Sequence, residues 1–155
     1  MKGNQEFTGG DVSDEKLREL VNNVGCTACV VLITIDEIIC ANAGDSRAVL
    51  TQSTSTYDLS DDHKPDNDDE ALRILEAGGN IESGRVNGKL SLSRAIGDLA
   101  YKQRKNEGPE KQMVTCVPDV TRRPRTFKDS FLLVACDGIW DSLSSHECSK
   151  LIHEL

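Results

Sequence analysis

Aspartates stand directly after apolar runs at two places in the chain. Asp45 follows one such run, and Asp137 follows the run Phe131 to Cys136, with Asp141 four residues later. A carboxylate at the end of a rigid strand is firmly held and faces a rim that ions and substrate can reach. Hard cations such as Mg²⁺ and Mn²⁺ take carboxylate and water oxygens, and Gly138 would let the backbone pass close to such an ion. The pattern fits a divalent-metal site, although aspartate also ends strands simply because its side chain stabilises turns.

A cysteine-based chemistry is the second possibility that the residue types raise. Cys116 and Arg122 have the Cys-x5-Arg spacing of cysteine-dependent phosphatases. That mechanism needs a loop of free backbone N–H groups that cradles phosphate. Pro118 removes one of these donors and the carboxylate of Asp119 would repel the anion. His63 has the chemistry of a general acid, but its place next to a proline favours a role in shaping a turn.

Composition limits the class of partner. The chain has 155 residues, which suits one ordinary domain, and a formal net charge of −8. Nucleic acid is therefore not expected as a partner, because phosphate backbones select basic surfaces. No apolar run approaches the ~20 residues that span a bilayer, so no membrane partner is expected. Cys40 and Cys136 lie inside apolar runs, where free cysteine behaves as a small hydrophobe, which predicts a reducing intracellular location in the cytoplasm or nucleus.

The elements that would position these residues are mostly strands. Their antiparallel-looking succession, with a few helices between, predicts an α+β fold with a sheet core. We expect a first helix at 14–21, capped by Ser13. A second helix should follow Pro65 and end at Gly78-Gly79, and a third should follow the capping box at Ser144. We expect a buried strand at 26–35, which forms a β-meander with strands at 38–42 and 46–51. Short strands should form a hairpin around Asn87-Gly88. Further strands are expected at 113–117 and at 130–136, which is the clearest buried strand.

The remaining segments are expected to be irregular. Residues 1–12 have the composition of a tail, and residues 52–62 that of a polar connection. Residues 101–112 are charged and predict a mobile stretch. The face of the helix after Pro65 that packs on the core is expected to carry Leu72, Ile74 and Leu75.

Several short segments together resemble, in order, the signature segments of the PP2C family of protein phosphatases. Gly25-Cys26-Thr27-Ala28 is similar to the family's Gly-Ser-Thr-Ala strand start, and the resemblance covers about residues 25–155. The stretch 101–112 most resembles the gamma-type enzymes. The matching segments are NAGDSR (42–47), DHKP (62–65), RVNGKLSLSRAIGD (85–98), KQMVTCVPD (111–119) and ACDGIWD (135–141).

The resemblance implies a fold and an activity. The fold is an α-β-β-α sandwich of two antiparallel sheets flanked by helices, with a metal site at one end. The activity is hydrolysis of phosphoserine or phosphothreonine in a phosphoprotein by a water that two core metals, Mg²⁺ or Mn²⁺, activate, with a possible third metal beside them. By position Asp137 would bind the core pair, and Asp45 and Asp141 the further metal. Thr27, Asp98 and Gly138 would support the site.

The family's pattern is incomplete in this sequence. The core site of the family also uses a Glu-Asp pair, an arginine, an Asp-Gly-His-Gly-Gly segment and a later Asp-Asn segment, and none of these occurs here. We therefore expect a tail or short helix at 1–24 and a partial phosphatase domain at 25–155, taken from a longer chain. No catalytic residue is assigned within it, and the piece alone is expected to be inactive.

Two alternatives stay open at this stage. The chain could be a pseudophosphatase or interaction module that keeps the fold without the core metals, or a cysteine-dependent phosphatase that uses Cys116. A partial domain should also expose sheet edges or core surface, which predicts dimerisation or strand exchange.

Overall fold

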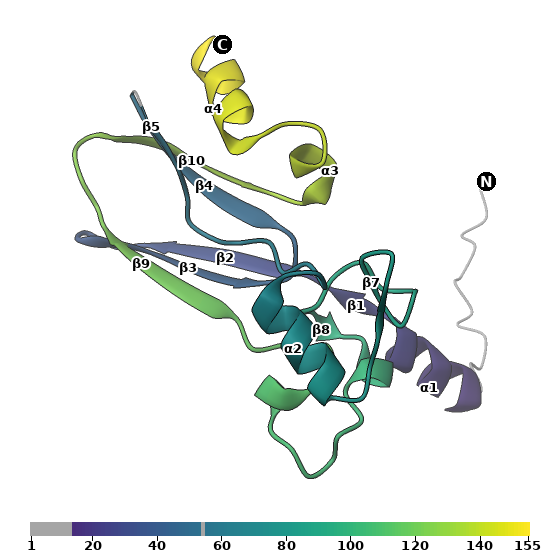
Figure 1. Cartoon of the computed structure of the whole chain (residues 1–155). Coiled ribbons are helices and arrows are strands. Elements are labelled where there is room, and N and C mark those ends of the chain that lie inside the picture. Colours follow the sequence, from purple (N-terminus) through teal and green to yellow (C-terminus); the bar gives the residue numbers. More distant parts are fainter. Residues whose placement is uncertain (1–13, 54) are drawn as a thin grey trace, which may run out of the picture.

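Two three-stranded antiparallel sheets packed against each other form the centre of the molecule (Figure 1). The computed structural model describes residues 14–53 and 55–155. One sheet has the order β2-β3-β9 and the other β10-β4-β5. Their bounds are β2 Ala28–Ile33, β3 Glu37–Ala43, β4 Arg47–Gln52, β5 Ser55–Asp58, β9 Asp119–Pro124 and β10 Asp129–Ala135. This α+β architecture of antiparallel sheets with flanking helices is the one that the sequence predicts.

Shorter elements lie around this sandwich. The two-residue strands β1 and β8 pair with each other, as do β6 and β7. None of the helices within 14–53 and 55–155 is long and apolar enough to cross a membrane. The bounds are α1 Asp14–Asn23, β1 Gly25–Cys26, α2 Asp68–Glu76, β6 Ile81–Glu82, β7 Arg85–Val86, β8 Ile96–Gly97, the 3-10 turns η1 Leu99–Tyr101 and η2 Pro109–Lys111, α3 Asp137–Trp140 and α4 Ser145–His153.

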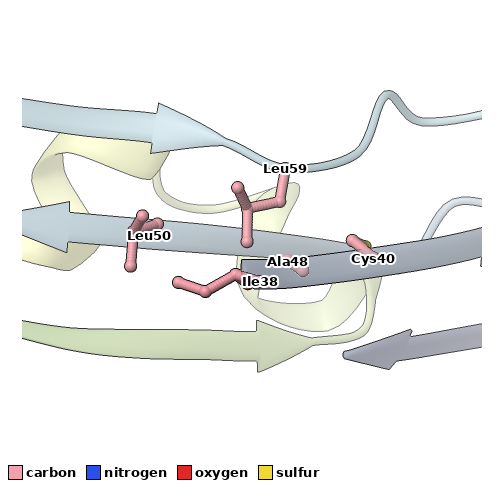
Figure 2. Packing of buried hydrophobic residues seen from close by; sticks show 5 residues of the cluster. All are labelled: Ile38, Cys40, Ala48, Leu50 and Leu59. Carbon is pink, nitrogen blue, oxygen red and sulfur yellow. The ribbon is translucent and has the colours of Figure 1, made fainter. Parts of the chain in front are cut away.

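The predicted β-meander is wrong, because the chain changes sheet between β3 and β4. β3 pairs with β2 and β9, whereas β4 pairs with β10 and β5. The change occurs at Gly44, whose φ of +127° is open to glycine and strained for other residues. It sets the two strands face to face, so that Ile38 and Cys40 of β3 meet Ala48 and Leu50 of β4 in the core between the sheets (Figure 2). Burial of these apolar side chains is the main contribution of the crossover to the stability of the fold.

The two strands that the sequence marks as buried are buried on one face only. On β2, Cys29 and Val31 pack on the core, while Val30 and Leu32 are 62% and 57% exposed. β10 lies at the edge of its sheet, and its Val134 is exposed. Long apolar runs suggest burial on both faces, but the described part of the chain supplies no layer over the outer face of β2.

The predictions for the other strands also need correction. β9 and β5 were not foreseen, because DVTRRP and STYD are polar sequences of edge strands; β9 is mostly exposed and β5 is half-buried. The strand expected at 113–117 is reduced to a single bridge between Arg94 and Thr115. Asn87-Gly88 does form a tight turn, closed by a Val86–Leu90 bridge, but the hairpin of β6 and β7 turns at Ser83-Gly84.

The helix predictions are confirmed in outline. α1, α2 and α4 occur where expected, and α4 starts with the capping box formed by Ser144 and Glu147. On α2, however, Leu72 and Leu75 are exposed, and only Ile74 of the predicted apolar face is buried. The predicted tail 1–12 and the Ser13 cap lie outside the described residues.

Two other expectations concern local packing. Residues 101–112 were expected to be mobile; in the structure the buried side chain of Gln112 accepts a bond from the Arg104 amide and donates to the carbonyls of Arg104, Glu107 and Gly108. Cys40 is buried as expected, whereas Cys136 is exposed.

Candidate functional site

The turn between the two sheets holds Asp45 in a fixed position. Its side chain is only 5% exposed, and it accepts a hydrogen bond of 2.6 Å from the ammonium group of Lys64. Ser46 is tied to Thr27 by a hydroxyl–hydroxyl contact of 2.8 Å. A Cβ on Gly44 would lie 2.4 Å from Cγ2 of Thr27, so this close approach requires glycine. Thr27 therefore packs on the turn that carries Asp45.

Lys64 connects Asp45 with a second carboxylate predicted for the site. Burial lowers the pKa of Lys64, but its bond to Asp45 and the charge of that carboxylate outweigh burial, and the pKa is raised. The charges of Asp141 and Asp62 act in the same direction. Asp141, far away in sequence, therefore lies within electrostatic reach of the same ammonium group. Lys64 is therefore bonded to Asp45 and is also influenced by the charge of Asp141.

Asp137 and Asp141 stand at the two ends of the short helix α3. Both are exposed, and the amide of Asp141 donates to the carbonyl of Asp137 at 2.8 Å. Trp140 anchors the helix because its ring is buried and its indole N–H donates to Ala135 O at 2.7 Å. A Cβ on Gly138 would meet only the sulfur of Cys136, at 3.9 Å. Nothing in the described chain therefore requires glycine at that position.

Asp98 directly follows β8, in the small β1–β8 sheet. It is 7% exposed, has a φ of +49°, and its amide donates to the carbonyl of Val24. A Cβ on Gly25 would lie only 2.0 Å from Oδ2 of Asp98. The β1–β8 pair thus places Asp98 against Gly25, close along the chain to Thr27.

These carboxylates do not form a ready metal site. Across 14–53 and 55–155, no group of three or more His, Cys, Asp or Glu side chains is arranged to hold a metal ion. Mg²⁺ requires near-octahedral oxygen coordination, and Asp45 is already paired with Lys64. The residues present therefore do not fit a complete Mg²⁺ or Mn²⁺ site by themselves.

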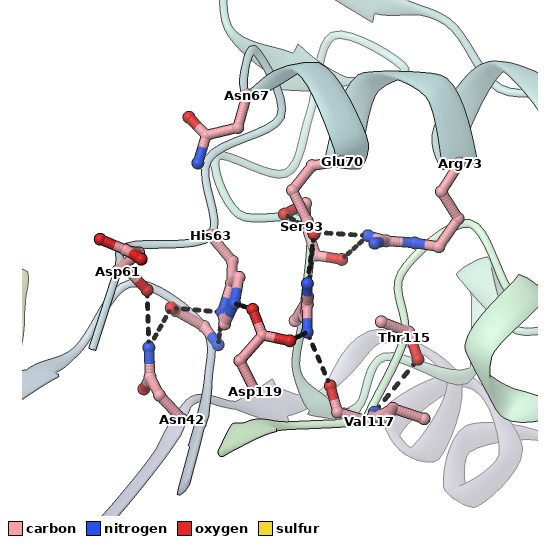
Figure 3. Close-up of polar contacts among 12 residues, drawn as sticks. Asn42, Asp61, His63, Asn67, Glu70, Arg73, Ser93, Thr115, Val117 and Asp119 are labelled. Atoms are coloured by element: carbon pink, nitrogen blue, oxygen red, sulfur yellow. Dashed lines mark hydrogen bonds and ion pairs between the residues drawn. The ribbon is translucent and has the colours of Figure 1, made fainter. Parts of the chain in front are cut away.

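Sequence analysis missed an ion-pair network that runs from the buried Glu70 to the exposed Asp119 (Figure 3). Glu70 on α2 accepts bonds from Arg94 at 2.6 and 2.9 Å, and Arg94 donates to Asp119 at 2.6 Å. Asp119 in turn contacts Nε2 of His63 at 3.1 Å. On the other side of the ring, Nδ1 of His63 lies 3.1 Å from the amide of Gly44. The network links α2 to the turn that carries Asp45.

The contacts also decide the roles of the other charged candidates. His63 is buried and fixes a turn, as expected. Arg47 aligns a carboxylate, because its guanidinium forms two bonds of 2.9 Å to Asp62. The side chain of Arg122 is directed to Glu37 at 3.4 Å on the neighbouring strand. This geometry gives no support to a phosphate loop formed by Cys116 and Arg122.

The fold and the site together define a class, an α+β sandwich whose sheet crossover carries an acidic turn. A solved serine-threonine phosphatase 2C from Toxoplasma gondii has the same fold, with a TM-score of 0.75 at 23% identity over 90% of this chain and 49% of that one. Another solved phosphatase from that organism is 41% identical, with a TM-score of 0.70, over 74% of this chain and 36% of that one.

The sequence comparisons then give the family. The family model described as protein phosphatase 2C matches residues 4–155. A probable protein phosphatase 2C of Arabidopsis thaliana is 55% identical over 84% of this chain, and protein phosphatase 2C homolog 2 of Saccharomyces cerevisiae is 48% identical over 83%. The chain belongs to the protein phosphatase 2C family. It spans 37% of the length of the Arabidopsis relative and 28% of the yeast relative.

Proposed function

We propose that this chain forms part of the catalytic domain of a phosphatase that removes phosphate from phosphoserine and phosphothreonine in proteins. Membership of the protein phosphatase 2C family supports the reaction class. The observation that carries the proposal is the ion pair of Asp45 with Lys64, an ammonium group whose pKa is also raised by the charge of Asp141. These two carboxylates belong to family segments 96 positions apart in the sequence, and their common influence on Lys64 supports a shared functional region.

We propose Mg²⁺ or Mn²⁺ as the cofactor of the complete domain. Asp137 is assigned to the core metal pair, and Asp45 and Asp141 to a further metal. Because the described residues contain no cluster of three ligands, these aspartates supply only part of a donor set. Additional carboxylates must join them before a metal can be held with the coordination it requires.

The 155-residue chain alone is proposed to have little or no phosphatase activity. The test is hydrolysis of p-nitrophenyl phosphate by the purified chain with Mn²⁺ and with a chelator. Turnover is expected to equal the background in both. Mn²⁺-dependent turnover that Asp137→Ala abolishes would show that the chain builds a working site from fewer ligands, and would overturn the proposal of inactivity.

The phosphatase function itself needs a longer chain in the assay. A version extended by a family segment that contains Asp-Gly-His-Gly-Gly should hydrolyse p-nitrophenyl phosphate and a phosphothreonine peptide in a Mn²⁺-dependent manner. Asp137→Ala should remove that activity, whereas Asp36→Ala, in the hairpin turn between β2 and β3, should leave it unchanged. A folded extended chain without activity would instead indicate a pseudophosphatase.

A further inference from the structure

The crossover turn between β3 and β4 contains a carboxylate that is almost fully buried. The side chain of Asp45 is 5% exposed. Burial of an unpaired carboxylate is costly, so Asp45 needs a cation or several hydrogen-bond donors beside it. In the part of the chain that the structure describes, Lys64 supplies the cation, with its ammonium group 2.6 Å from Oδ2 of Asp45. Lys64 is itself only 37% exposed, which distinguishes this pair from a fully solvated surface contact.

The backbone on both sides of Lys64 is fixed. The carbonyl of Asp62 accepts from the amide of Lys64 at 3.1 Å, and the carbonyl of Lys64 accepts from the amide of Asn67, also at 3.1 Å. Pro65, the next residue in the chain, is fully buried. The lysine side chain therefore leaves from a rigid turn, and its ion pair orders little additional backbone.

His63 ties this turn to the crossover turn. The amide of His63 donates to the carbonyl of Gly44 at 3.0 Å, and Nδ1 of His63 lies 3.1 Å from the amide of Gly44. The other ring nitrogen of His63 contacts Asp119 (Figure 3). Gly44 and His63 each directly precede one member of the ion pair in the sequence. The bonds between them therefore set the two charged side chains against each other.

The ion pair engages the same carboxylate that is assigned to the further metal. Lysine is charged at neutral pH, and the carboxylates of Asp141 and Asp62 also attract the ammonium group of Lys64. Mg²⁺ and Mn²⁺ bind carboxylate oxygens directly. A divalent ion and an ammonium group repel each other at short range, so they compete for one buried carboxylate.

We propose that Lys64 is an internal cation that takes the place of the further metal at Asp45, so that a divalent ion binds this carboxylate only when the ammonium group leaves it. The inference rests on the assignment of Asp45 to a metal in the proposed function. Lys64 then has two effects. It stabilises the acidic turn before a metal binds, and it lowers the affinity of Asp45 for the metal.

The test is equilibrium binding of Mn²⁺ to the purified 155-residue chain, measured from the electron paramagnetic resonance signal of free Mn²⁺. Lys64→Gln removes the charge and keeps a side-chain donor, and it should tighten Mn²⁺ binding roughly tenfold or more. Adding Asp45→Asn to Lys64→Gln should abolish this gain. Lys64→Arg keeps the charge, and it should bind Mn²⁺ as weakly as the unaltered chain does.

Lys128→Gln is the matched control for the loss of one positive charge. Lys128 is exposed and precedes Asp129, which pairs with Gln52 at the end of β4 opposite to the crossover turn. Its replacement should leave Mn²⁺ binding unchanged. No gain in Lys64→Gln, a gain that survives Asp45→Asn, or an equal gain in Lys64→Arg or Lys128→Gln would each overturn the proposal.

The stability of Lys64→Gln gives a second readout that does not need a folded variant at the start. Without metal the variant should be less stable, because its buried carboxylate has lost its cation. Mn²⁺ should raise the Tm of Lys64→Gln more than that of the unaltered chain, and should refold the variant if it is unfolded without metal. A variant that Mn²⁺ neither stabilises nor refolds would contradict the exchange of one cation for the other. Neither readout uses turnover, so failure here is distinct from failure of the phosphatase function, which the extended chain tests.

Discussion

At the scale of single residues, Glu70 is the buried carboxylate whose ionisation should matter most for stability. Its side chain is 3% exposed and accepts bonds from Arg73, Arg94 and Ser93. Burial raises the pKa of Glu70, but these three partners outweigh it and lower the pKa from 4.5 to about 2. A lowered pKa means that the folded state holds the proton less tightly than the unfolded state, so the stabilisation is present above pH 4.5 and is lost as the pH falls toward 2.

Glu70→Gln should therefore lower the free energy of unfolding at neutral pH and flatten its decline in acid. A shift of this size corresponds to about 3 kcal/mol between neutral pH and pH 2. Urea unfolding at a series of pH values measures both effects. Glu76→Gln, on the exposed side of the same helix, is the control and should follow the unaltered chain. Parallel pH curves for both variants and the unaltered chain would show that Glu70 is not the titrating group.

Gly44 is a second residue at which a substitution should lower stability, since both its φ and its surroundings exclude a side chain. Gly44→Ala would place a Cβ at a φ of +127° and 2.4 Å from Thr27, which should lower the free energy of unfolding by about 3 kcal/mol. Gly78→Ala is the matched control, because its φ is +84° but nothing lies within 4 Å of the added Cβ. It should cost only about 1 kcal/mol. Thermal unfolding of both variants compares backbone strain alone, in Gly78→Ala, with backbone strain plus steric overlap, in Gly44→Ala. Similar losses of stability in the two variants would contradict the close approach of Gly44 to Thr27.

At the scale of elements, the capping box of α4 is a local signal with a measurable contribution. The Ser144 hydroxyl accepts from the amide of Glu147 at 3.2 Å, and the Glu147 carboxylate accepts from the amide of Ser144 at 2.9 Å. Ser144→Ala should lower the free energy of unfolding by about 1 kcal/mol. Ser142→Ala, in the exposed turn just before, should change it by less than about 0.5 kcal/mol. Equal values from chemical denaturation would mean that α4 starts without help from this cap.

The helices could be predicted because their signals are contained in a few neighbouring residues. The acids that begin α2, the Gly78-Gly79 stop and the Ser144 box each act within one turn of helix. Strand partners could not be predicted in the same way. The apolar runs at β2, β3 and β4 are equally compatible with one sheet or two, and only the packing of Ile38 and Cys40 on Ala48 and Leu50 decides between them.

The candidate site residues stand out in the sequence by type and position, whereas the residues that contact them do not. Asp45 and Asp137 stand out because each follows an apolar run, and Asp141 because it lies four residues after Asp137. The residues that hold the surrounding structure are distant in sequence, as with Asp119, which meets His63 from 56 positions away. Asp119 stands beside a proline and Glu70 within an acidic helix start, and neither setting predicts that both would form ion pairs with Arg94.

At the scale of the whole molecule, the two sheets differ in what covers their outer faces. The outer face of β10-β4-β5 is packed by α3 and α4, where Trp140 and Cys148 contact Val49. On β2-β3-β9, the corresponding row contains Val30, Leu32 and Val120, all more than half exposed. An apolar sheet face of this kind, beside the open edge of β2, favours association with another surface. We therefore expect the isolated chain to self-associate.

Leu32→Lys should weaken that association, because it puts a charge at the centre of the uncovered face. Leu72→Lys is the matched control: Leu72 is equally exposed, at 57%, but stands on α2, away from this sheet face. Sedimentation velocity at increasing protein concentration should show larger species for the unaltered chain and for Leu72→Lys, and mainly monomer for Leu32→Lys. If all three sediment as monomers, the outer face of β2-β3-β9 tolerates water in spite of its composition. If all three associate equally, another surface, such as the open edge of β10, carries the contact.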